Sequence, residues 1–245
     1  MSLDAKWTRT VDDGKTNAAW DTYDSTIMKE VNDYNSKFKS TPGFKAADWT
    51  LFKALLWVES GGPGNPSWTK RVMQIGNPHD PGYKVLKGGT EGSSLVMSTQ
   101  LASDIKRNSI DDPQLNIRAG IAYVYTRMAK FDTKSVDDPK DASDHSYTVL
   151  PGDSLEKIAA KVGTTVEVLG KMNPAAKRMI HPKQVLKFRK ASMQRVIVGW
   201  RDFSTANLQT LYNGNRDPDY AAKLQYVLEL FGHLTRPAST QTTPP

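Results

Sequence analysis

Residues 48–62 read Asp-Trp-Thr-Leu-Phe-Lys-Ala-Leu-Leu-Trp-Val-Glu-Ser-Gly-Gly and decide the fold of the larger part of the chain. Apolar side chains fill the positions from Leu51 to Val58, and only Lys53 interrupts them. A helix that is apolar on most sides is buried on most sides. Asp48 is a suitable N-cap, and the glycines after Ser60 supply a C-terminal turn. The stretch therefore predicts a central, buried helix.

The carboxyl group of Glu59 stands at the end of this apolar run. Apolar surroundings disfavour the charged form and raise the pKa of a carboxyl group, which makes it a proton donor near neutral pH. The neighbouring glycines, 61 and 62, leave room for a ligand. The other interpretation is an ordinary Glu at an exposed helix end, and Glu59 taken alone favours that interpretation.

Helical periodicity continues on both sides of this stretch. Residues 1–15 show no strong period and predict a loose lead-in, and residues 61–92 are rich in Gly and Pro. Apolar residues at steps of three and four predict further helices over 16–38, 93–107, 113–128 and 196–231. The fold class is therefore predicted to be mainly α.

The pattern changes after residue 131. Residues 132–144 are polar and acidic, as is typical of a linker. The next segment predicts a strand from Tyr147, a helix capped by Ser154, a helix capped by Thr164 or Thr165, and a strand over 185–188. Residues 145–190 thus predict a small βααβ unit.

Most of the net charge of +7 lies in this small unit. Residues 145–190 contain nine Lys or Arg and three Asp or Glu, a net +6, which leaves about +1 for the rest of the chain. Such a segment favours an anionic polymer as partner. Nucleic acid and bacterial cell wall both qualify, and so does a solvated basic face without a partner.

Several classes of site are disfavoured by composition. The chain has no cysteine, and its four histidines are far apart in sequence, so we expect no metal site and no cofactor. No apolar stretch is long enough for a membrane span, so we expect no membrane insertion. The N-terminus lacks the apolar core of a secretory signal peptide.

The segment from Tyr147 to Phe188 resembles a LysM domain along its whole length. It differs at Lys183, where the family usually has Gly before Gln. The resemblance implies binding of N-acetylglucosamine polymers, meaning peptidoglycan or chitin, between two loops. The residues expected to bind the glycan are Gly152, Asp153, Ser154, Leu155, Asn173, Pro174 and Ile180.

A second resemblance is to the lysozyme-like superfamily, in particular to soluble lytic transglycosylases. It is carried by four short motifs in the family's order: Trp57–Gly61, Val72–Ile75 in place of a family strand, Asn116–Tyr123, and Leu211–Gly214. The resemblance implies a lysozyme-like helical domain that cleaves the MurNAc-GlcNAc β-1,4 bond of peptidoglycan, with Glu59 as catalytic acid. It also implies substrate binding by Ser60, Met73, Gln74, Tyr123, Tyr212 and Asn213.

A second carboxylate is needed if water completes the cleavage, either as nucleophile or as base. Asp80 is the candidate for it, with Glu91 and the more distant Asp104 as further options, although a surface role is favoured for each. Lytic transglycosylases manage with one Glu, because the C6 hydroxyl of the substrate replaces water. The sequence leaves muramidase and transglycosylase both open.

Because residues expected in one cleft lie on both sides of the LysM segment, we predict that LysM is inserted into the helical domain. The predicted parts are 1–136 and 192–235 for the helical domain, 145–190 for LysM, and 236–245 for a disordered tail. The alternative is three consecutive domains. Insertion is preferred because residues 193–235 alone offer a small core.

Three alternatives concern function and location. The chain could be a catalytically inactive peptidoglycan-binding or scaffold protein. A nucleic-acid binder rests only on the basic charge and is not favoured. A wall-degrading domain without a signal peptide suggests an antibacterial effector or phage enzyme that a secretion system or phage exports, or else a mature fragment. It would act in the periplasm or on the cell wall, with an immunity protein as an expected partner of an effector.

Overall fold

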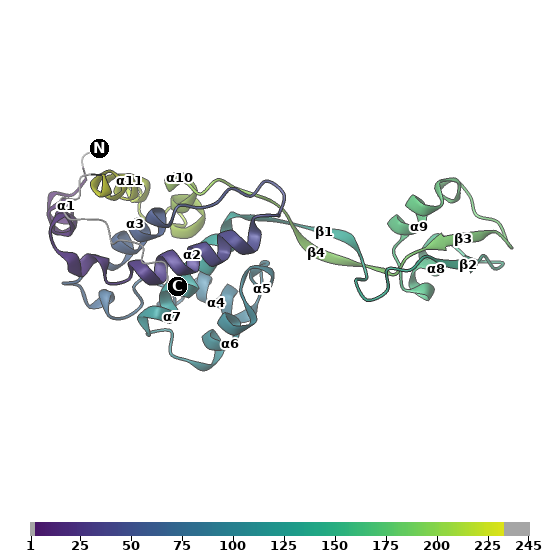
Figure 1. Ribbon diagram of the computed structural model, residues 1–245, viewed down its shortest axis with the longest axis horizontal. Coiled ribbons are helices and arrows are strands. Elements are labelled where there is room, and N and C mark those ends of the chain that lie inside the picture. Colours follow the sequence, from purple (N-terminus) through teal and green to yellow (C-terminus); the bar gives the residue numbers. More distant parts are fainter. Residues whose placement is uncertain (1–2, 233–245) are drawn as a thin grey trace, which may run out of the picture. The chain divides into compact units, whose positions relative to one another are not determined.

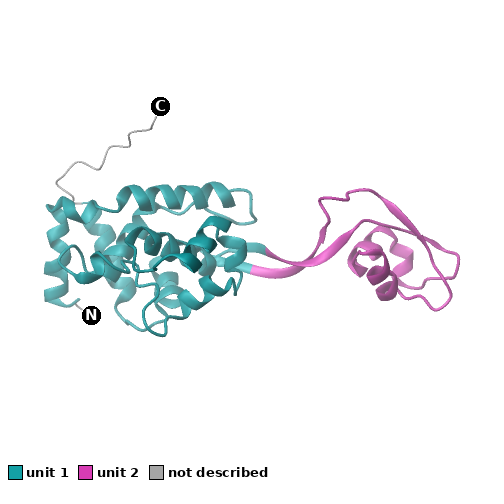
Figure 2. Cartoon of the chain, turned by 90° about the horizontal axis from the view of Figure 1, so that it is seen from below, with its two compact units in different colours: residues 1–130, 197–245 teal, residues 131–196 magenta. Residues whose placement is uncertain are grey.

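The computed structural model describes residues 3–232, and the chain divides into two compact units (Figures 1 and 2). One unit contains residues 1–130 and 197–245, and the other contains residues 131–196. The first, the helical unit, is thus built from two segments that lie on either side of the second unit in sequence. The predicted tail, 236–245, lies outside the described residues. No helix among residues 3–232 is long and apolar enough to cross a membrane.

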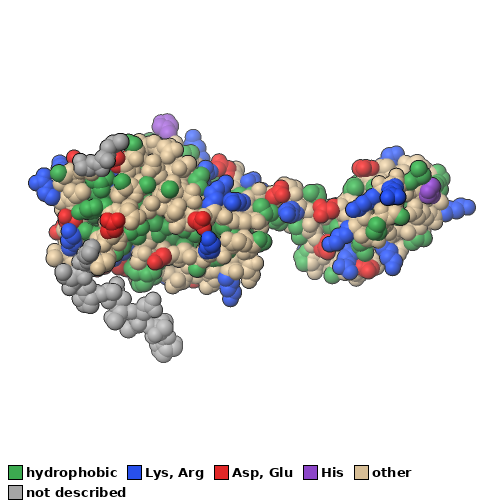
Figure 3. All heavy atoms as spheres, turned by 90° about the horizontal axis from the view of Figure 1, so that it is seen from above, with side chains coloured by type: hydrophobic (Ala, Val, Ile, Leu, Met, Phe, Trp, Pro, Cys, Tyr) green, Lys and Arg blue, Asp and Glu red, His purple; other side chains and the backbone are tan. Residues whose placement is uncertain are grey.

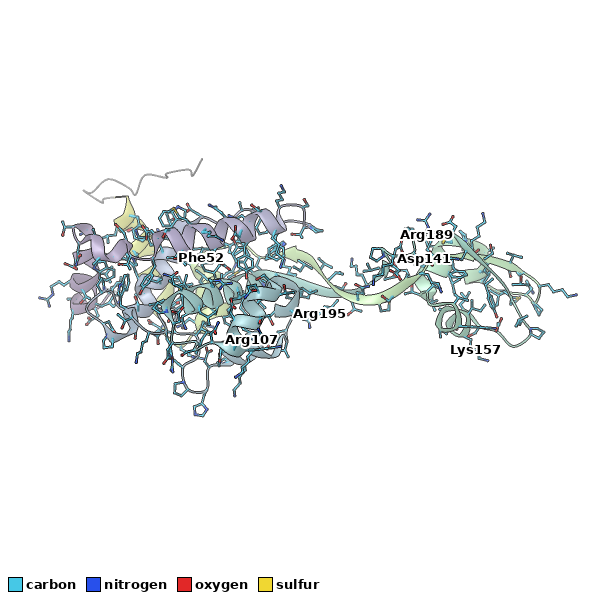
Figure 4. All side chains as sticks on the ribbon, turned by 60° about the horizontal axis from the view of Figure 1, so that its bottom comes forward. Phe52, Arg107, Asp141, Lys157, Arg189 and Arg195 are labelled. Carbon is cyan, nitrogen blue, oxygen red and sulfur yellow. The ribbon has the colours of Figure 1, made fainter. Side chains whose placement is uncertain are left out.

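Helix α3 (Trp49–Ser60) is the centre of the helical unit and confirms the prediction for this stretch. Asp48 caps its first turn by accepting a hydrogen bond from the Thr50 amide at 2.9 Å. Gly61 ends it in the left-handed conformation, at φ 70°. Most of its side chains are buried, and Phe52 (labelled in Figure 4) stacks on Tyr125 with the ring centroids 5.7 Å apart.

The other helices of this unit surround α3. Helices α2 and α11 pack directly on it, and α7 packs on α2. Helix α7 begins at residue 113, as predicted, with Asp112 as N-cap and Pro113 in the first turn. The mainly α fold class is confirmed by α2 (Asp24–Phe38), α4 (Pro81–Gly88), α5 (Ser93–Val96), α6 (Thr99–Arg107), α7 (Pro113–Met128), α10 (Thr205–Leu208) and α11 (Tyr220–Phe231), with short helical turns η1 (Asp13–Lys15), η2 (Ala18–Asp21), η3 (Pro66–Trp68) and η5 (Gln209–Asn213).

The helix predicted over 16–38 begins only at Asp24, and two other predictions for the helical unit are wrong. The expected loose lead-in contains α1 (Ala5–Asp12), which Asp4 caps with two hydrogen bonds to backbone amides. The predicted helix over 93–107 is broken, because Met97 is extended and Ser98 caps α6 as a new helix. A serine inside an apparent helix has here begun the next one.

The second unit contains a βααβ module, residues 145–188, as predicted. Strands β2 (His145–Thr148) and β3 (Val185–Phe188) pair antiparallel, with His145 opposite Phe188. Helices α8 (Leu155–Val162) and α9 (Val166–Met172) lie between them in sequence, followed by the turn η4 (Pro174–Lys177). The core is formed by Val149, Ile158, Ala159, Leu169, Ala176, Leu186 and Phe188.

A two-stranded ribbon, made of β1 (Ala129–Asp137) and β4 (Ala191–Trp200), forms the two chain segments that flank this module. Its strands correct two predictions, the irregular linker from residue 132 and the helix beginning near residue 196. The spacing of Val196 and Trp200 suits a helix, but pairing with a segment more than fifty residues away decides the conformation.

Candidate functional site

Glu59 lies in the last turn of α3, and its side chain is largely buried. Burial raises the pKa of its carboxyl group to about 7. A hydrogen bond from Tyr220 and the positive charge of Arg216 oppose this rise, whereas the negative charges of Asp80 and Asp217 add to it. Glu59 therefore holds a proton that can be lost near neutral pH.

Tyr220 is a residue of the candidate site that the sequence analysis missed. It is the first residue of α11, it is buried, and its hydroxyl donates a hydrogen bond to Oε1 of Glu59. Burial and the charge of Glu59 raise the pKa of Tyr220 well above its ordinary value, so the hydroxyl keeps its proton. The sequence pattern places Tyr220 only on the buried stripe of a helix. The usable signal was that a buried tyrosine hydroxyl needs a partner.

Tyr212 and Tyr123 lie together, and Tyr212 lies near the carboxyl group of Glu59. Their ring centroids are 5.6 Å apart, and the Tyr212 hydroxyl donates to the carbonyl oxygen of Met73 at 2.7 Å. Burial first, and then the charge of Glu59, raises the pKa of Tyr212. The structure thus links Glu59, Met73, Tyr123 and Tyr212, which come from four separate motifs.

The loop around Met73 and Gln74 is not the strand that the family resemblance implied. Gln74 has φ 56°, and its side chain is engaged by the Arg71 carbonyl and by Asn77. Asn116 holds the loop instead, since its Oδ1 accepts from the Met73 amide at 2.9 Å and its Nδ2 donates to the Ile75 carbonyl at 2.7 Å. The buried Met73 side chain faces the protein interior, in contact with Gly120.

Asp80, the candidate second carboxylate, is the N-cap of α4. Its two oxygens accept hydrogen bonds from the amides of Gly76, Gly82 and Tyr83 at 2.7, 2.8 and 3.2 Å. The negative charge of Asp80 helps to raise the pKa of Glu59. Its hydrogen bonds, however, fix the conformation of the loop between Gly76 and Tyr83. The other two options are ion-paired at 2.7 and 2.9 Å: Glu91 with Arg127 and Asp104 with Arg118.

Two further predicted residues use their polar groups within the protein. The Ser60 hydroxyl is buried and donates to the Leu56 carbonyl at 2.7 Å, and the Asn213 oxygen accepts from the Asp217 amide at 2.9 Å. The space expected for a ligand at Gly62 is filled as well. A Cβ atom there would lie 2.1 Å from the Trp20 ring, so this glycine accommodates a tryptophan.

In the βααβ module, the predicted glycan-binding residues hold the first loop in place. Asp153 accepts hydrogen bonds from the Tyr147 hydroxyl at 2.9 Å and the Leu150 amide at 2.8 Å, and these bonds lower its pKa. Gly152 takes φ 82°, and Ser154 caps α8. Leu155 packs partly buried against the module core.

The second loop of the module is fixed by Asn173. Its side chain binds both the amide and the carbonyl of Lys187, at 2.9 and 2.6 Å, and so ties the end of α9 to β3. Pro174 begins η4, and Ile180 packs against the core. Lys183, which replaces the family's Gly, has φ 71°, a conformation that glycine adopts most readily.

The exposed face of the module combines basic and apolar side chains. Lys and Arg outnumber acidic side chains on the face of the module seen in Figure 3. Figure 4, in another view, labels two basic side chains of the module, Lys157 and Arg189. Met179 and Val185 are 64% and 59% exposed. Within residues 3–232, no three His, Asp or Glu side chains come together in a group that could hold a metal ion.

Comparison with known families identifies one part of the chain. Residues 147–189 match the LysM domain, so the βααβ module is a LysM domain. LysM domains bind peptidoglycan-type glycans, and the match supports binding of peptidoglycan or chitin by this chain. No curated protein and no solved structure matches the chain.

Proposed function

We propose that this chain binds peptidoglycan through its LysM domain and cleaves the MurNAc-GlcNAc β-1,4 bond with Glu59 as general acid and base. The observation that carries the proposal is the pKa of Glu59, which burial raises to about 7. Cleavage of a glycosidic bond needs a carboxylic acid that is still protonated near neutral pH. The resemblance of four ordered motifs to soluble lytic transglycosylases supports the same assignment.

Tyr220 determines which oxygen of Glu59 carries the proton. Its hydroxyl donates to Oε1, so Oε1 acts as an acceptor and Oε2 is left to bear the proton. In the proposed step, Oε2 protonates the glycosidic oxygen as the bond to C1 breaks. The resulting carboxylate is stabilised by the Tyr220 hydrogen bond and by the charge of Arg216.

The product we propose is a 1,6-anhydro end. Asp80 is committed to three backbone amides, and both Glu91 and Asp104 to arginines, which favours a mechanism with one carboxylate. The C6 hydroxyl then attacks C1, and ionised Glu59 takes the hydroxyl proton, so that the acid is regenerated. Mass spectrometry of the released fragments tests this step. Reducing ends instead of anhydro ends would identify a muramidase.

Glu59→Gln tests the enzyme itself. The amide keeps an oxygen for Tyr220 but has no acidic proton, so release of soluble fragments from purified sacculi should fall about a thousandfold or more. Sedimentation with sacculi should be unchanged, because LysM is intact. Glu91→Gln, which removes a half-exposed ion pair with Arg127, is the matched control and should stay within a factor of two. A fully active Glu59→Gln would leave only a wall-binding protein.

The LysM contribution can be removed without cutting the ribbon. The Asp138 amide donates to the Lys190 carbonyl at 2.8 Å, so these residues face each other across β1 and β4. Replacing 139–189 by Asn-Gly closes the ribbon as a hairpin. Activity on whole sacculi should fall about tenfold or more, because the domain no longer concentrates the enzyme on the polymer, while activity on short soluble fragments is kept. Equal losses on both substrates would contradict the anchoring role.

A further inference from the structure

A cavity of about 420 Å³ lies in the helical unit, along one face of α2 and against the starts of α6 and α7. It shares no lining residue with the Glu59 site. Glu30, Tyr34 and Lys37 lie at successive helical turns of α2, so all three side chains face the cavity. Arg118 of α7 faces it from the other side.

The hydroxyl group of Tyr34, which lines this cavity, lacks a hydrogen-bond partner among the described residues. The residue is 4% exposed and stacks on Tyr125, with the ring centroids 4.6 Å apart. Its hydroxyl is buried and has no hydrogen-bond partner among the residues that the structure describes. A buried hydroxyl without a partner costs free energy, and a ligand that supplies the partner recovers that cost.

The carboxylate of Glu30 likewise lacks a hydrogen-bond donor within the described part of the chain. Its side chain is 14% exposed, and its nearest positive group is Nε of Arg118 at 3.7 Å, which is too far for a hydrogen bond. Within residues 3–232, its carboxylate accepts no hydrogen bond, since Arg118 donates to Asp104 instead, at 2.9 Å. Burial raises the pKa of Glu30, and Arg118 opposes this rise. A donor group in the cavity would satisfy Glu30 and Tyr34 together.

Positive groups lie beside these acceptors. Lys37 Nζ donates to the carbonyls of Val96 and Met97, at 2.5 and 3.3 Å, which leaves one of its three N–H groups for a ligand. The ion pair of Lys29 and Asp33 is more than half exposed. The cavity therefore presents both a partly buried carboxylate and cationic donors, a combination that complements a small molecule with both charges.

We propose that this cavity binds a small zwitterion, an α-amino acid or a dipeptide. Its ammonium group is bound by Glu30 and the Tyr34 hydroxyl, and its carboxylate by Lys37 and Arg118. The inference does not depend on cleavage by Glu59.

Isothermal titration of the full chain with D-alanine and with D-alanyl-D-alanine tests the proposal, and comparison of the two ligands separates the amino acid from the dipeptide. Saturable binding of at least one is expected. N-acetylation or C-amidation of that ligand should weaken it about tenfold or more, because each removes one charge-assisted contact.

Two variants locate the site. Glu30→Gln should weaken binding about tenfold or more, and Tyr34→Phe severalfold. Tyr34→Phe removes only a hydroxyl that has no partner in the free protein, so it should not impair folding. Asp202→Asn, which breaks an exposed pair with Lys45, is the control and should bind as the parent does. Glu59→Gln should also bind normally.

Absence of saturable binding for both ligands would overturn the proposal. Unchanged affinity in both the Glu30→Gln and the Tyr34→Phe variants would overturn it as well, because the zwitterion would then bind elsewhere.

Discussion

The hydrogen bonds that fix the LysM loops and the one that binds Glu59 in the helical unit join residues at different separations in sequence. In LysM, Asp153 binds Tyr147, six residues away, and Asn173 binds Lys187, fourteen residues away. At the candidate site, Tyr220 binds Glu59 across 161 residues. Local contacts leave a motif with fixed spacing that a family model can match. Contacts between distant segments leave no such spacing, and four predictions test how far this contrast extends.

Gly62→Ala should have the largest effect. Its Cβ would meet the Trp20 ring at 2.1 Å and its φ is 86°, so we expect the free energy of unfolding to fall by about 3 kcal/mol or more. Gly152→Ala in LysM is the matched control, because its φ is 82° but nothing lies within 4 Å. It should cost only about 1 kcal/mol. Chemical denaturation measures both, and equal costs would remove the contrast.

Glu59→Gln should stabilise the protein at alkaline pH. The pKa of Glu59 is about 7 in the folded state against an ordinary value of 4.5, so the free energy of unfolding of the wild type declines as pH rises through this window. The introduced glutamine does not ionise, so the variant lacks this pH dependence. Its free energy of unfolding should exceed that of the wild type by about 2 kcal/mol at pH 8, allowing for partial solvent access, and should equal it at pH 4. Denaturation at both pH values measures the difference.

Glu156 of LysM provides the opposite case, since local hydrogen bonds lower its pKa. Glu156→Gln should lose stability at pH 8 relative to pH 4. If both variants were more stable than the wild type at pH 8, the effect could not be attributed to the burial of Glu59.

Tyr220→Phe should shift the pH dependence of cleavage upward. The Tyr220 hydrogen bond lowers the pKa of Glu59, so its loss keeps the acid protonated to higher pH, by roughly one unit. The pH profile of kcat/KM measures the shift. Tyr226→Phe, on the same helix but bonded to Asp12, should leave the profile unchanged. A downward shift would mean that Tyr220 does not stabilise the carboxylate.

Lys183→Gly should have the smallest effect, a stabilisation of LysM by about 0.5 kcal/mol. Glycine adopts φ 71° without strain, and its greater freedom in the unfolded chain offsets part of that gain. Lys187→Gly, in strand β3, should instead destabilise the domain. The thermal unfolding transition of LysM measures the change in stability for both variants. A change of the same sign in both would contradict the explanation from backbone conformation.

The same contrast explains what the sequence could predict. The caps of α3 and α8 lie within three residues of the groups they bind, so Asp48 and Ser154 were identified correctly. Helix α1 was missed because its packing comes from far away. Trp7 packs on Tyr226, and Asp12 accepts a hydrogen bond from the same tyrosine, 214 residues along the chain.

The sequence predicted the central residue of the candidate site but not the hydrogen-bond partners of the residues around it. Glu59 ends an apolar run that is visible in the sequence, so its burial could be anticipated. Ser60 and Asp80 are polar residues in the expected motif region. Ser60 binds the Leu56 carbonyl, however, and Asp80 binds the amides of Gly76, Gly82 and Tyr83. Which polar side chain faces a ligand and which one completes a turn depends on backbone geometry that spacing does not specify.

The ribbon of β1 and β4 has a consequence for proteolysis. A domain attached at a chain end is released by a single cut in its linker. LysM is attached through two strands that are hydrogen-bonded to each other, so one cut in either strand leaves it joined through the other. Two cuts are needed for release, and paired strands resist proteases better than an irregular linker does.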